Sequence, residues 1–429
     1  MLMRRLLLAT TAALFIAAPV LAQGLPRAAK PEEVGLSSDK LKAFTARLKE
    51  GVDKGEIPGV VAIIVRNGKV AYVDAVGFRD REEKAAMKPD AIFRIASMTK
   101  PIVSLAIMML AEEGKLSIAQ KVSDFIPEFA KLEVGVEKKK DDGTVELITE
   151  PQRRQMTVQD LLRHTSGLTY GTFDKSLVDQ EYLKAGINNR NLTTREFIGK
   201  LIRLPLKHQP GTTWEYSVST DVLAWIVEVV SGKPIDAFVA ERITGPLKMP
   251  DTGFWVDAKN LGRLAEAQKD AQGQRPVMRD VKAPPSWPSG GGGMVSTAAD
   301  YARFGQFWLN GGQLDGVRLI SRKTVELMTA NHLPPGTKLN AADTANPSPT
   351  RPTPVMGQGF GLGFAVRIAE GRNPMPGSVG EFYWAGAYGT NFVVDPKEKL
   401  VVVLMMQAPS QGANYRILMR QFAHEAITD

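Results

Sequence analysis

The sequence contains no cysteine and only four histidines among its 429 residues. The absence of cysteine excludes disulfides, thiolate nucleophiles and cysteine-ligated metal sites. The four histidines, His164, His208, His332 and His424, do not stand at a metal-binding spacing such as H-E-x-x-H. We therefore expect neither a metal nor another cofactor. Stability must come from a hydrophobic core, which a chain of this length can bury easily.

Long apolar runs are also missing after the N-terminus, where no stretch reaches the roughly 20 residues that a membrane-spanning helix needs. Residues 1–22 combine Arg4 and Arg5, an apolar run over Leu6–Pro19 and small residues ending at Ala22. This pattern is typical of a secretory signal peptide. We expect cleavage near Ala22 and an exported mature protein, periplasmic or secreted, that is not attached to a membrane; a retained N-terminal anchor is the alternative. Arg4 and Arg5 could belong to a twin-arginine signal but lack a convincing flanking pattern, so the sequence does not decide the export route.

Positive charge is plentiful but is not concentrated. The formal net charge is +8, from 54 basic and 46 acidic residues. The basic residues are scattered among the acids, and no Lys/Arg stripe is interleaved with stacking aromatics, so we expect no nucleic-acid partner. The densest charged run, residues 137–143, mixes both signs and is predicted to be a solvated turn.

Motifs of two other enzyme classes are absent. No G-x-S-x-G motif occurs, which argues against the α/β-hydrolase fold. The glycines Gly290–Gly293 are not followed by G-K-[ST], so they do not form a phosphate-binding loop. We expect them to form a flexible turn near the active site, before a helix capped at Ser296 or Thr297. The alternating glycines of residues 357–363 miss G-x-G-x-x-G and indicate a strand that another backbone passes closely.

Two pairs of β-rich runs lie near opposite ends of the chain. Val60–Val65 and Val70–Val73 flank Asn67-Gly68, a dipeptide suited to a type I′ hairpin turn. A second pair lies at residues 391–394 and 400–405. The chain between the two pairs is largely helical in pattern. We therefore predict an α+β fold in which both ends meet in one antiparallel sheet flanked by helices, with a mainly helical region inserted.

This pattern also suggests a domain division. Residues 30–115 and 285–429 are expected to form the sheet domain that carries the nucleophile, and residues 116–284 the mainly helical inserted region. Residues 341–354 are rich in proline, threonine, asparagine and alanine, and are predicted to form a mobile loop or an active-site flap.

The first candidate for chemistry is the pair Ser97 and Lys100. The segment Ser97–Glu113 is apolar almost all round, as in a buried helix, and Pro101 fits only its first turn, so the helix must begin close to Ser97. Residues at i and i+3 share a helix face, so the Lys100 ammonium can reach the Ser97 hydroxyl. A serine needs a neighbouring base, and lysine can serve when burial and other cations lower its pKa. S-x-x-K alone is common on surfaces, but a lysine on so apolar a helix needs a partner.

Two further segments are predicted to be helices, and each lies next to a polar residue of interest. Residues 157–163 begin with a near capping box, and residues 219–230 carry one apolar face, with Tyr216 in the loop before them. His164 follows the first of these helices directly. Its place favours a structural histidine that closes a turn over a member of a Ser-His-Asp triad.

Several stretches resemble one family in the same order. Phe93–Lys100 resembles the nucleophile segment of class C β-lactamases and of the related family VIII esterases. The further stretches are Leu161–Leu168, Pro210–Ser217 and Gly290–Thr297. The resemblance runs from about Val34 to Met406. It implies a β-lactamase/transpeptidase-like fold.

The resemblance implies a role for three side chains. Ser97 resembles the nucleophile, Lys100 the activating amine, and Tyr216 the phenol that acts as general base and then as acid to the leaving group. Tyrosine suits that role only if a nearby cation stabilises its phenolate, and Lys100 would be that cation. The alternative for Tyr216 is a residue that anchors a loop.

The family's third motif matches Trp384-Ala385-Gly386-Ala387. β-Lactamases usually carry Lys-Thr-Gly or His-Thr-Gly there, and the version here resembles that of family VIII esterases. The resemblance implies that Gly386 lets the backbone approach the substrate and that the N–H groups of Ala387 and Ser97 form an oxyanion hole. Trp384 could instead be a buried core residue. Trp384 stands where related β-lactamases carry a cation, and Val218 stands where they carry a side-chain amide. We therefore expect a cavity that lacks the positive charge needed to bind a substrate carboxylate.

We therefore predict a serine hydrolase that cleaves small carboxylic esters with short acyl chains, or amides, through an acyl-enzyme on Ser97. A β-lactamase or D-alanyl-D-alanine carboxypeptidase is the alternative. A catalytically inert relative that binds cell-wall peptide or a protein partner is a third possibility, which the presence of Ser97, Lys100 and Tyr216 together argues against. The sequence does not indicate the oligomeric state.

Overall fold

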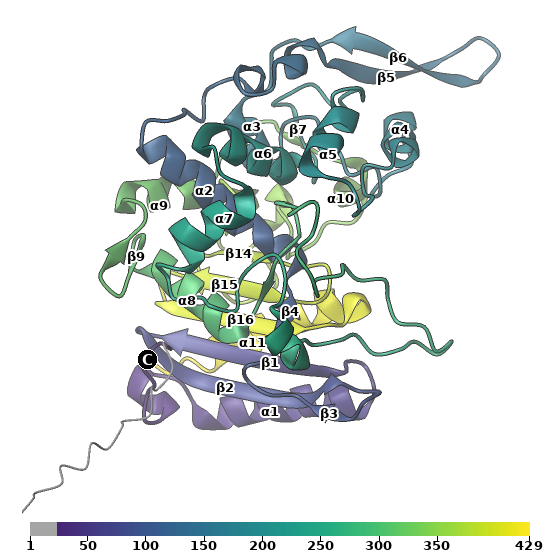
Figure 1. Ribbon diagram of the computed structural model, residues 1–429. Helices are drawn as coiled ribbons and strands as arrows, with labels where there is room; N and C mark the ends of the chain where they lie inside the picture. The colour runs from purple at the N-terminus through teal and green to yellow at the C-terminus, as the bar shows by residue number, and fades with distance from the viewer. Residues whose placement is uncertain (1–23) are drawn as a thin grey trace, which may run out of the picture.

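The computed structural model describes residues 24–429 (Figure 1). The predicted signal peptide, residues 1–22, lies outside the described residues. No helix within residues 24–429 is long and apolar enough to cross a membrane.

An eight-stranded sheet, drawn from both ends of the chain, forms the base of the molecule. Its strand order is β12-β13-β14-β15-β16-β1-β2-β3. The strands are β1 (Gly59–Arg66), β2 (Lys69–Asp80), β3 (Ala85–Ala86), β12 (Gln358–Phe360), β13 (Ala365–Arg367), β14 (Phe382–Ala385), β15 (Asn391–Asp395) and β16 (Leu400–Met406). Every pairing along the sheet is antiparallel.

The predicted hairpins and their meeting are confirmed. β1 and β2 pair around Asn67 and Gly68, whose φ angles of 52° and 76° fit the turn expected of this dipeptide. β1 also pairs with β16, from Val60 opposite Met406 to Arg66 opposite Leu400. β1 is buried throughout because strands and helices cover it on all sides. The α+β fold with one antiparallel sheet is therefore confirmed.

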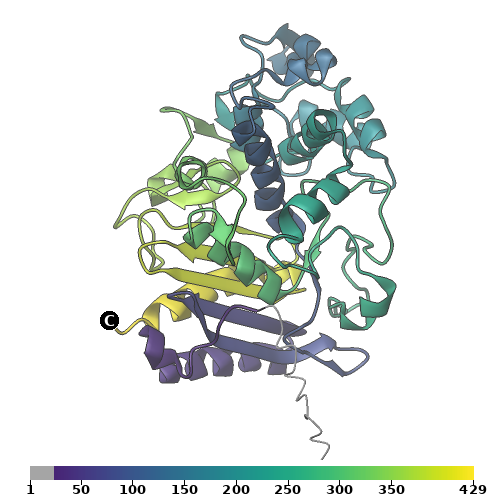
Figure 2. The same ribbon diagram turned by 60° about the vertical axis from the view of Figure 1, so that its left-hand side comes forward.

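Helices cover both faces of this sheet. α1 (Ser38–Asp53) and α11 (Gly412–Glu425) pack against each other and against β2 and β16, respectively. α8 (Ala298–Leu309) packs on β1, β15 and β16, and lies above the sheet in Figure 2 while α1 lies below it. α8 begins at an N-cap, Thr297, whose side chain accepts a hydrogen bond from the backbone N–H of Asp300, so the second of the two predicted cap positions is the one used.

A mainly helical layer lies above the sheet (Figure 1). Its helices are α3 (Val158–Leu162), α4 (Leu177–Ala185), α5 (Thr194–Leu201), α6 (Ser219–Ser231) and α7 (Ile235–Val239), with a π-helical turn at Ala240–Thr244. α2 (Thr99–Glu112) is buried from Thr99 to Leu110 and packs against α6. The predicted capping box at Thr157 is confirmed, with Asp160 as its partner. α2 thus joins the helical layer to the sheet.

Smaller elements complete the chain. They are β4 (Phe93–Arg94), β5 (Glu133–Lys139), β6 (Val145–Pro151), β7 (Thr213–Trp214), β8 (Val295–Ser296), β9 (Gln313–Leu314), β10 (Val317–Arg318), β11 (Lys338–Leu339), α9 (Arg322–Thr329) and α10 (Ala341–Ala345).

Two local predictions need correction. The segment 137–143 is not one turn, because Glu137–Lys139 belong to β5, which pairs with β6 in a ribbon that projects from the molecule (Figure 1). The ribbon is largely exposed, so its sequence does not alternate between apolar and polar residues as a strand with one buried face does. This is why the strand was not predicted. The segment 341–354 is not wholly a loop, since it begins with α10, where Asn340 caps the backbone N–H of Asp343.

Candidate active site

Ser97 lies at a sharp turn between the sheet and α2. β4 pairs with β8 just before it, and residues Ala96–Met98 form a 3-10 turn that leads into α2. Ala96 has a φ of 44°, in the left-handed region that alanine rarely adopts. The Thr99 hydroxyl donates to the Ala96 carbonyl at 2.7 Å, and the Tyr301 hydroxyl donates to the Met98 carbonyl at 2.8 Å. These contacts hold the strained turn, as is common at functional sites.

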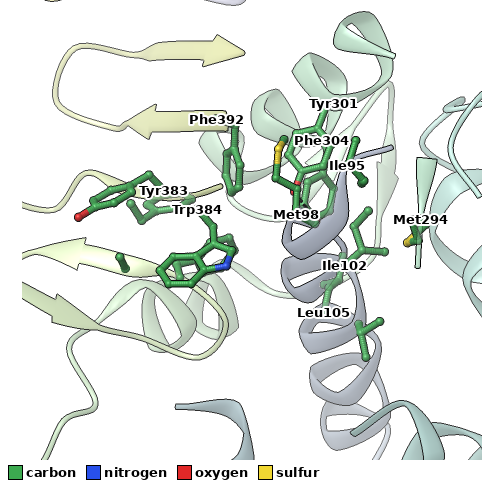
Figure 3. Packing of buried hydrophobic residues seen from close by; sticks show 14 of the residues in the cluster. Ile95, Met98, Ile102, Leu105, Met294, Tyr301, Phe304, Tyr383, Trp384 and Phe392 are labelled. Carbon is green, nitrogen blue, oxygen red and sulfur yellow. Dashed lines mark hydrogen bonds between the residues drawn. The ribbon is translucent and has the colours of Figure 1, made fainter. Parts of the chain in front are cut away.

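The apolar core fixes the start of α2 from several directions. Figure 3 shows Met98, Ile102 and Leu105 along this helix, with Tyr301 and Phe304 of α8 beside its first turn and Trp384 on the side of the strands. All of these side chains belong to the main hydrophobic cluster. Ser97 is therefore held by a rigid element, which an acyl-accepting nucleophile requires.

Lys100 lies beneath Ser97 and is only 2% exposed. Its ammonium donates to the Ser97 Oγ at 3.4 Å, to the Tyr170 hydroxyl at 3.0 Å and to the Gly291 carbonyl at 2.6 Å. It also lies 4.5 Å from the centre of the Tyr216 ring. Within residues 24–429 no carboxylate pairs with this ammonium. A buried cation is thus held by neutral oxygens and an aromatic face.

The electrostatics of Lys100 differ from the sequence-based expectation. Burial disfavours the charged amine, but the phenols of Tyr170 and Tyr216 act in the opposite direction and raise the pKa of Lys100 above its ordinary value. The condition under which lysine could serve as the base, a pKa lowered by burial and other cations, is not met, because the neighbours of the amine are phenols rather than cations. Lys100 therefore stays protonated at neutral pH.

Tyr216 lies in the loop before α6, surrounded by aromatic rings. The Trp384 Nε1–H donates to the Tyr216 hydroxyl at 3.2 Å. The neighbouring rings, with centroid distances between 4.9 and 6.1 Å, are those of His164, Tyr170, Phe173, Trp214 and Trp384. The phenol is thus oriented by packing and by one donated hydrogen bond.

Tyr170 is a site residue that the sequence reasoning missed. Burial raises the pKa of Tyr170, while the adjacent Lys100 acts in the opposite direction. The only signal in the sequence was its place two residues after the stretch Leu161–Leu168. Tyr170 is separated from Lys100 by 70 positions, so only the fold reveals their hydrogen bond.

The turn Gly290–Gly293 lies at the site, as predicted. Its carbonyl at Gly291 accepts from Lys100, and the Asp221 carboxylate holds the turn by accepting from the Ser289 hydroxyl at 2.6 Å and from the Gly291 N–H at 3.0 Å. The predicted close approach at residues 357–363 also occurs, because a Cβ on Gly361 would collide with the Met328 carbonyl oxygen.

The segment after β14 closely approaches the backbone that precedes Ser97. A Cβ on Gly386 would collide with the Ile95 carbonyl oxygen, so only glycine fits there. The N–H of the next residue, Ala387, has no hydrogen-bond partner within the described chain. An unpaired backbone N–H beside the serine can donate a hydrogen bond to a developing oxyanion.

His164 supports the site without touching Ser97. Its Nδ1 lies 3.2 Å from the Ser217 hydroxyl, and its carbonyl accepts from the Glu215 N–H at 2.9 Å. Burial, with a smaller contribution from Lys100, holds the pKa of His164 well below its usual value. Its φ of 58° closes the turn after α3. This geometry agrees with a structural histidine.

A cavity of about 330 Å³ opens beside Ser97. Ser97, Tyr216, Trp384 and Ala387 line it together, whereas Lys100 and Gly386 lie behind its surface. The other lining residues are Phe173, Trp214, Asn340, Ala342, Asp343, Thr350, Arg351, Ala385 and Arg416. The expectation of a cavity without a cation is wrong, because Arg351 and Arg416 come from segments far from Trp384 in the sequence.

One cluster outside this cavity has the residue types of a metal site. Glu381, Asp395 and His424 lie close together below the sheet. Arg367 and Arg420 both form ion pairs with Glu381 Oε1, so two guanidinium groups already neutralise this carboxylate. The cluster is best explained as a buried ion network between β13, β15, α11 and the residue before β14.

Comparisons with known proteins agree on one family. The model of the family described as Beta-lactamase matches residues 44–423. Protein Rv1367c of Mycobacterium tuberculosis is 36% identical over 372 residues, covering 84% of this chain and 88% of that protein. Esterase EstB of Burkholderia gladioli is 30% identical over 406 residues, covering 89% of this chain and 94% of that protein.

Solved structures give the same picture. EstCE1, described as a hydrolase with promiscuous acyltransferase activity, superimposes with a TM-score of 0.75 at 27% identity and covers 90% of this chain and 99% of its own. A penicillin-binding protein homologue from Pyrococcus abyssi superimposes with a TM-score of 0.61 at 22% identity, covering 88% of this chain and 76% of its own, which supports the fold.

Proposed function

This chain belongs to the β-lactamase family and is a serine hydrolase, and we propose that it cleaves small carboxylic esters through an acyl-enzyme on Ser97. One observation carries the proposal. The Ser97 hydroxyl lies 3.4 Å from a buried, protonated Lys100 and shares its cavity with Tyr216. Nucleophile, cation and phenol are the groups that acyl transfer by a serine requires in this family.

In the first step, the Ser97 oxygen attacks the ester carbonyl while its proton passes to the phenolate of Tyr216. A protonated Lys100 at 4.5 Å from that ring stabilises the phenolate. The N–H groups of Ser97 and Ala387 donate hydrogen bonds to the carbonyl oxygen and stabilise the negative charge that forms on it. The base is therefore the phenol, and the amine contributes its charge.

In the second step, the C–O bond to the alcohol breaks and Tyr216 gives its proton to the leaving oxygen. Water then attacks the acyl-enzyme and loses a proton to Tyr216. The bond to the Ser97 oxygen breaks and Tyr216 returns that proton to it, so the acid is released and the Ser97 hydroxyl and the phenolate are restored. The hydrogen bond from Trp384 to the Tyr216 hydroxyl keeps the phenol oriented through both proton transfers.

Esters are favoured over β-lactams by two features of this chain. Trp384 offers an apolar wall and one N–H donor at the place where related β-lactamases carry a cation. EstB, a relative that is 30% identical to this chain, is described as an esterase. β-Lactam or D-alanyl-D-alanine hydrolysis is the second candidate, because the family model itself is that of β-lactamases.

The covalent step is tested by mass. Incubation with a fluorophosphonate should add one label to the wild type, and peptide mapping should place it on Ser97. Ser97→Ala should take up no label and should lose turnover of p-nitrophenyl butyrate. Retention of label or of turnover in Ser97→Ala would reject the assignment.

Substrate class is tested on the same preparation. We expect kcat/KM for p-nitrophenyl butyrate to exceed that for nitrocefin. Trp384→Lys should shift the ratio toward nitrocefin by about one order of magnitude, the value of a charge-assisted hydrogen bond. A wild type that prefers nitrocefin would establish the β-lactamase alternative and leave Trp384 as a packing residue.

We also propose that the chain is exported, on the strength of the pattern in residues 1–22. Expression of the full chain in a Gram-negative host, with fractionation and N-terminal sequencing, should yield a periplasmic or secreted product that begins near Gln23. A cytoplasmic, uncleaved product would contradict this proposal.

A further inference from the structure

Two arginines reach the active-site cavity from different parts of the chain. Arg416 lies in the first turns of α11, and Arg351 lies in the segment that follows α10. Both line the same cavity as Ser97 and Tyr216. Guanidinium groups that face a substrate cavity are suited to bind a carboxylate through two parallel hydrogen bonds.

The protein itself leaves Arg416 largely unsatisfied. Its Nη2 donates to the Gly386 carbonyl at 2.8 Å, its Nε is buried without a partner, and no carboxylate pairs with it within the described residues. Burial lowers the pKa of Arg416 to about 10, and repulsion from Arg351 acts in the same direction while Tyr216 opposes it. Arg416 is only partly buried, but its buried Nε lacks a partner, so an anion that accepts a hydrogen bond from this guanidinium would relieve part of the cost.

Arg351 is only partly neutralised. Its Nη1 pairs with Asp343 of α10, whose side chain is 4% exposed, while the side chain of Arg351 is 50% exposed. The cavity therefore holds two guanidinium groups against one carboxylate. A single negative charge in the substrate would balance the three groups.

We propose that the preferred substrates are esters that carry a carboxylate, held by Arg416 and Arg351 while Ser97 attacks the ester carbonyl. This inference rests on the proposed function and narrows its substrate class. The aromatic lining from Phe173, Trp214 and Trp384 surrounds the apolar part of such a substrate, and the two arginines bind its charged end. The carboxylate can belong to the acyl part or to the alcohol part of the ester.

The test uses two pairs of esters that differ only in charge. In the first pair, 4-(butyryloxy)benzoate and 4-(butyryloxy)benzamide, the charge lies on the alcohol side. In the second pair, monoethyl adipate and ethyl adipamate, it lies on the acyl side. We expect kcat/KM for the carboxylate to exceed that for the amide by about 10-fold or more in one of the pairs, and that pair identifies the side that binds the arginines.

Variants separate recognition from catalysis. Arg416→Met and Arg351→Met should each remove most of this preference, mainly through a higher KM for the carboxylate. Arg195 of α5 is an exposed arginine away from the cavity, so Arg195→Met is the matched control and should keep the preference. Because each ratio is measured within one protein, a partly unfolded preparation does not change it. Added salt at about 0.5 M should weaken the preference in the wild type.

The outcomes distinguish this inference from the proposed function. Turnover of both members of a pair that depends on Ser97, without a preference for the carboxylate in either pair, would overturn the inference and leave the esterase proposal standing. A preference that survives in both arginine variants would also overturn it. Failure of Ser97-dependent turnover for all four esters and for p-nitrophenyl butyrate would instead reject the proposed function.

Discussion

We call Ser97 and the two residues behind it, Lys100 and Tyr170, the floor of the cavity, and residues 340–351 its wall. The floor and the wall hold their charges in opposite ways. Lys100 is 2% exposed and is bound by neutral oxygens, so its charge is not neutralised by any acid of the described chain. Arg351 in the wall is half exposed and pairs with Asp343. The floor therefore holds a positive charge that no acid neutralises, whereas the wall holds an arginine that is paired with an acid but is exposed enough to bind a substrate as well.

This difference predicts that changes in the floor act on the chemical step and changes in the wall act on substrate choice and on local stability. The largest effects should therefore come from the floor and from the phenol above it.

Removing Lys100 or Tyr216 should cause the largest loss. Lys100→Ala and Tyr216→Phe should each lower kcat by several orders of magnitude, the size expected for loss of general base catalysis, because each group depends on the other. The double variant should fall to a similar level, since groups that act as a unit lose activity non-additively. Steady-state kinetics with p-nitrophenyl butyrate measure all three. A double variant that equals the product of two independent losses would break the proposed coupling.

Tyr170→Phe should have an intermediate effect, lowering kcat by roughly 10-fold through loss of the hydrogen bond at 3.0 Å to Lys100. Tyr170 raises the pKa of Lys100, so its removal should lower that pKa. The proposed mechanism requires the protonated amine, so the alkaline limb of the pH-rate profile should move to lower pH.

The matched control for Tyr170 is Tyr182, another buried tyrosine, whose hydroxyl has no hydrogen-bond partner among residues 24–429. Tyr182→Phe should leave both kcat and the pH profile unchanged. If Tyr170→Phe behaves like this control, Tyr170 is a packing residue and the floor consists of Ser97 and Lys100 alone.

The smallest effect should come from the wall. Asp343→Asn removes the ion pair with Arg351, and because that arginine is half exposed, the free energy of unfolding should fall by less than about 1 kcal/mol. Urea unfolding measures the change, with Glu181→Gln, which breaks an exposed pair with Lys184, as the control. A loss above about 3 kcal/mol would show that the wall is part of the structural core and would contradict the proposed difference between the wall and the floor.

Much of the fold could be predicted because its signals are local. Asn67-Gly68 between two β-rich runs predicted the first hairpin, and Pro101 placed the start of α2 within a few residues of Ser97. The exposed ribbon at residues 133–151 was missed because both of its faces meet solvent and its charged residues resemble a turn. α10 was missed because its five residues are too few for a periodic pattern.

The sequence by itself determined the chemistry that neighbours in the chain create. The spacing of Ser97 and Lys100 on an apolar helix puts an amine beside a hydroxyl, because residues three apart share a helix face. Only the tertiary structure decided what surrounds them. Tyr170 and Tyr216 raise the pKa of Lys100, and Arg351 and Arg416 place positive charge in a cavity that was expected to have none. Electrostatic energies depend on distances in space and on burial, and for residues tens or hundreds of positions apart only the folded chain sets either quantity.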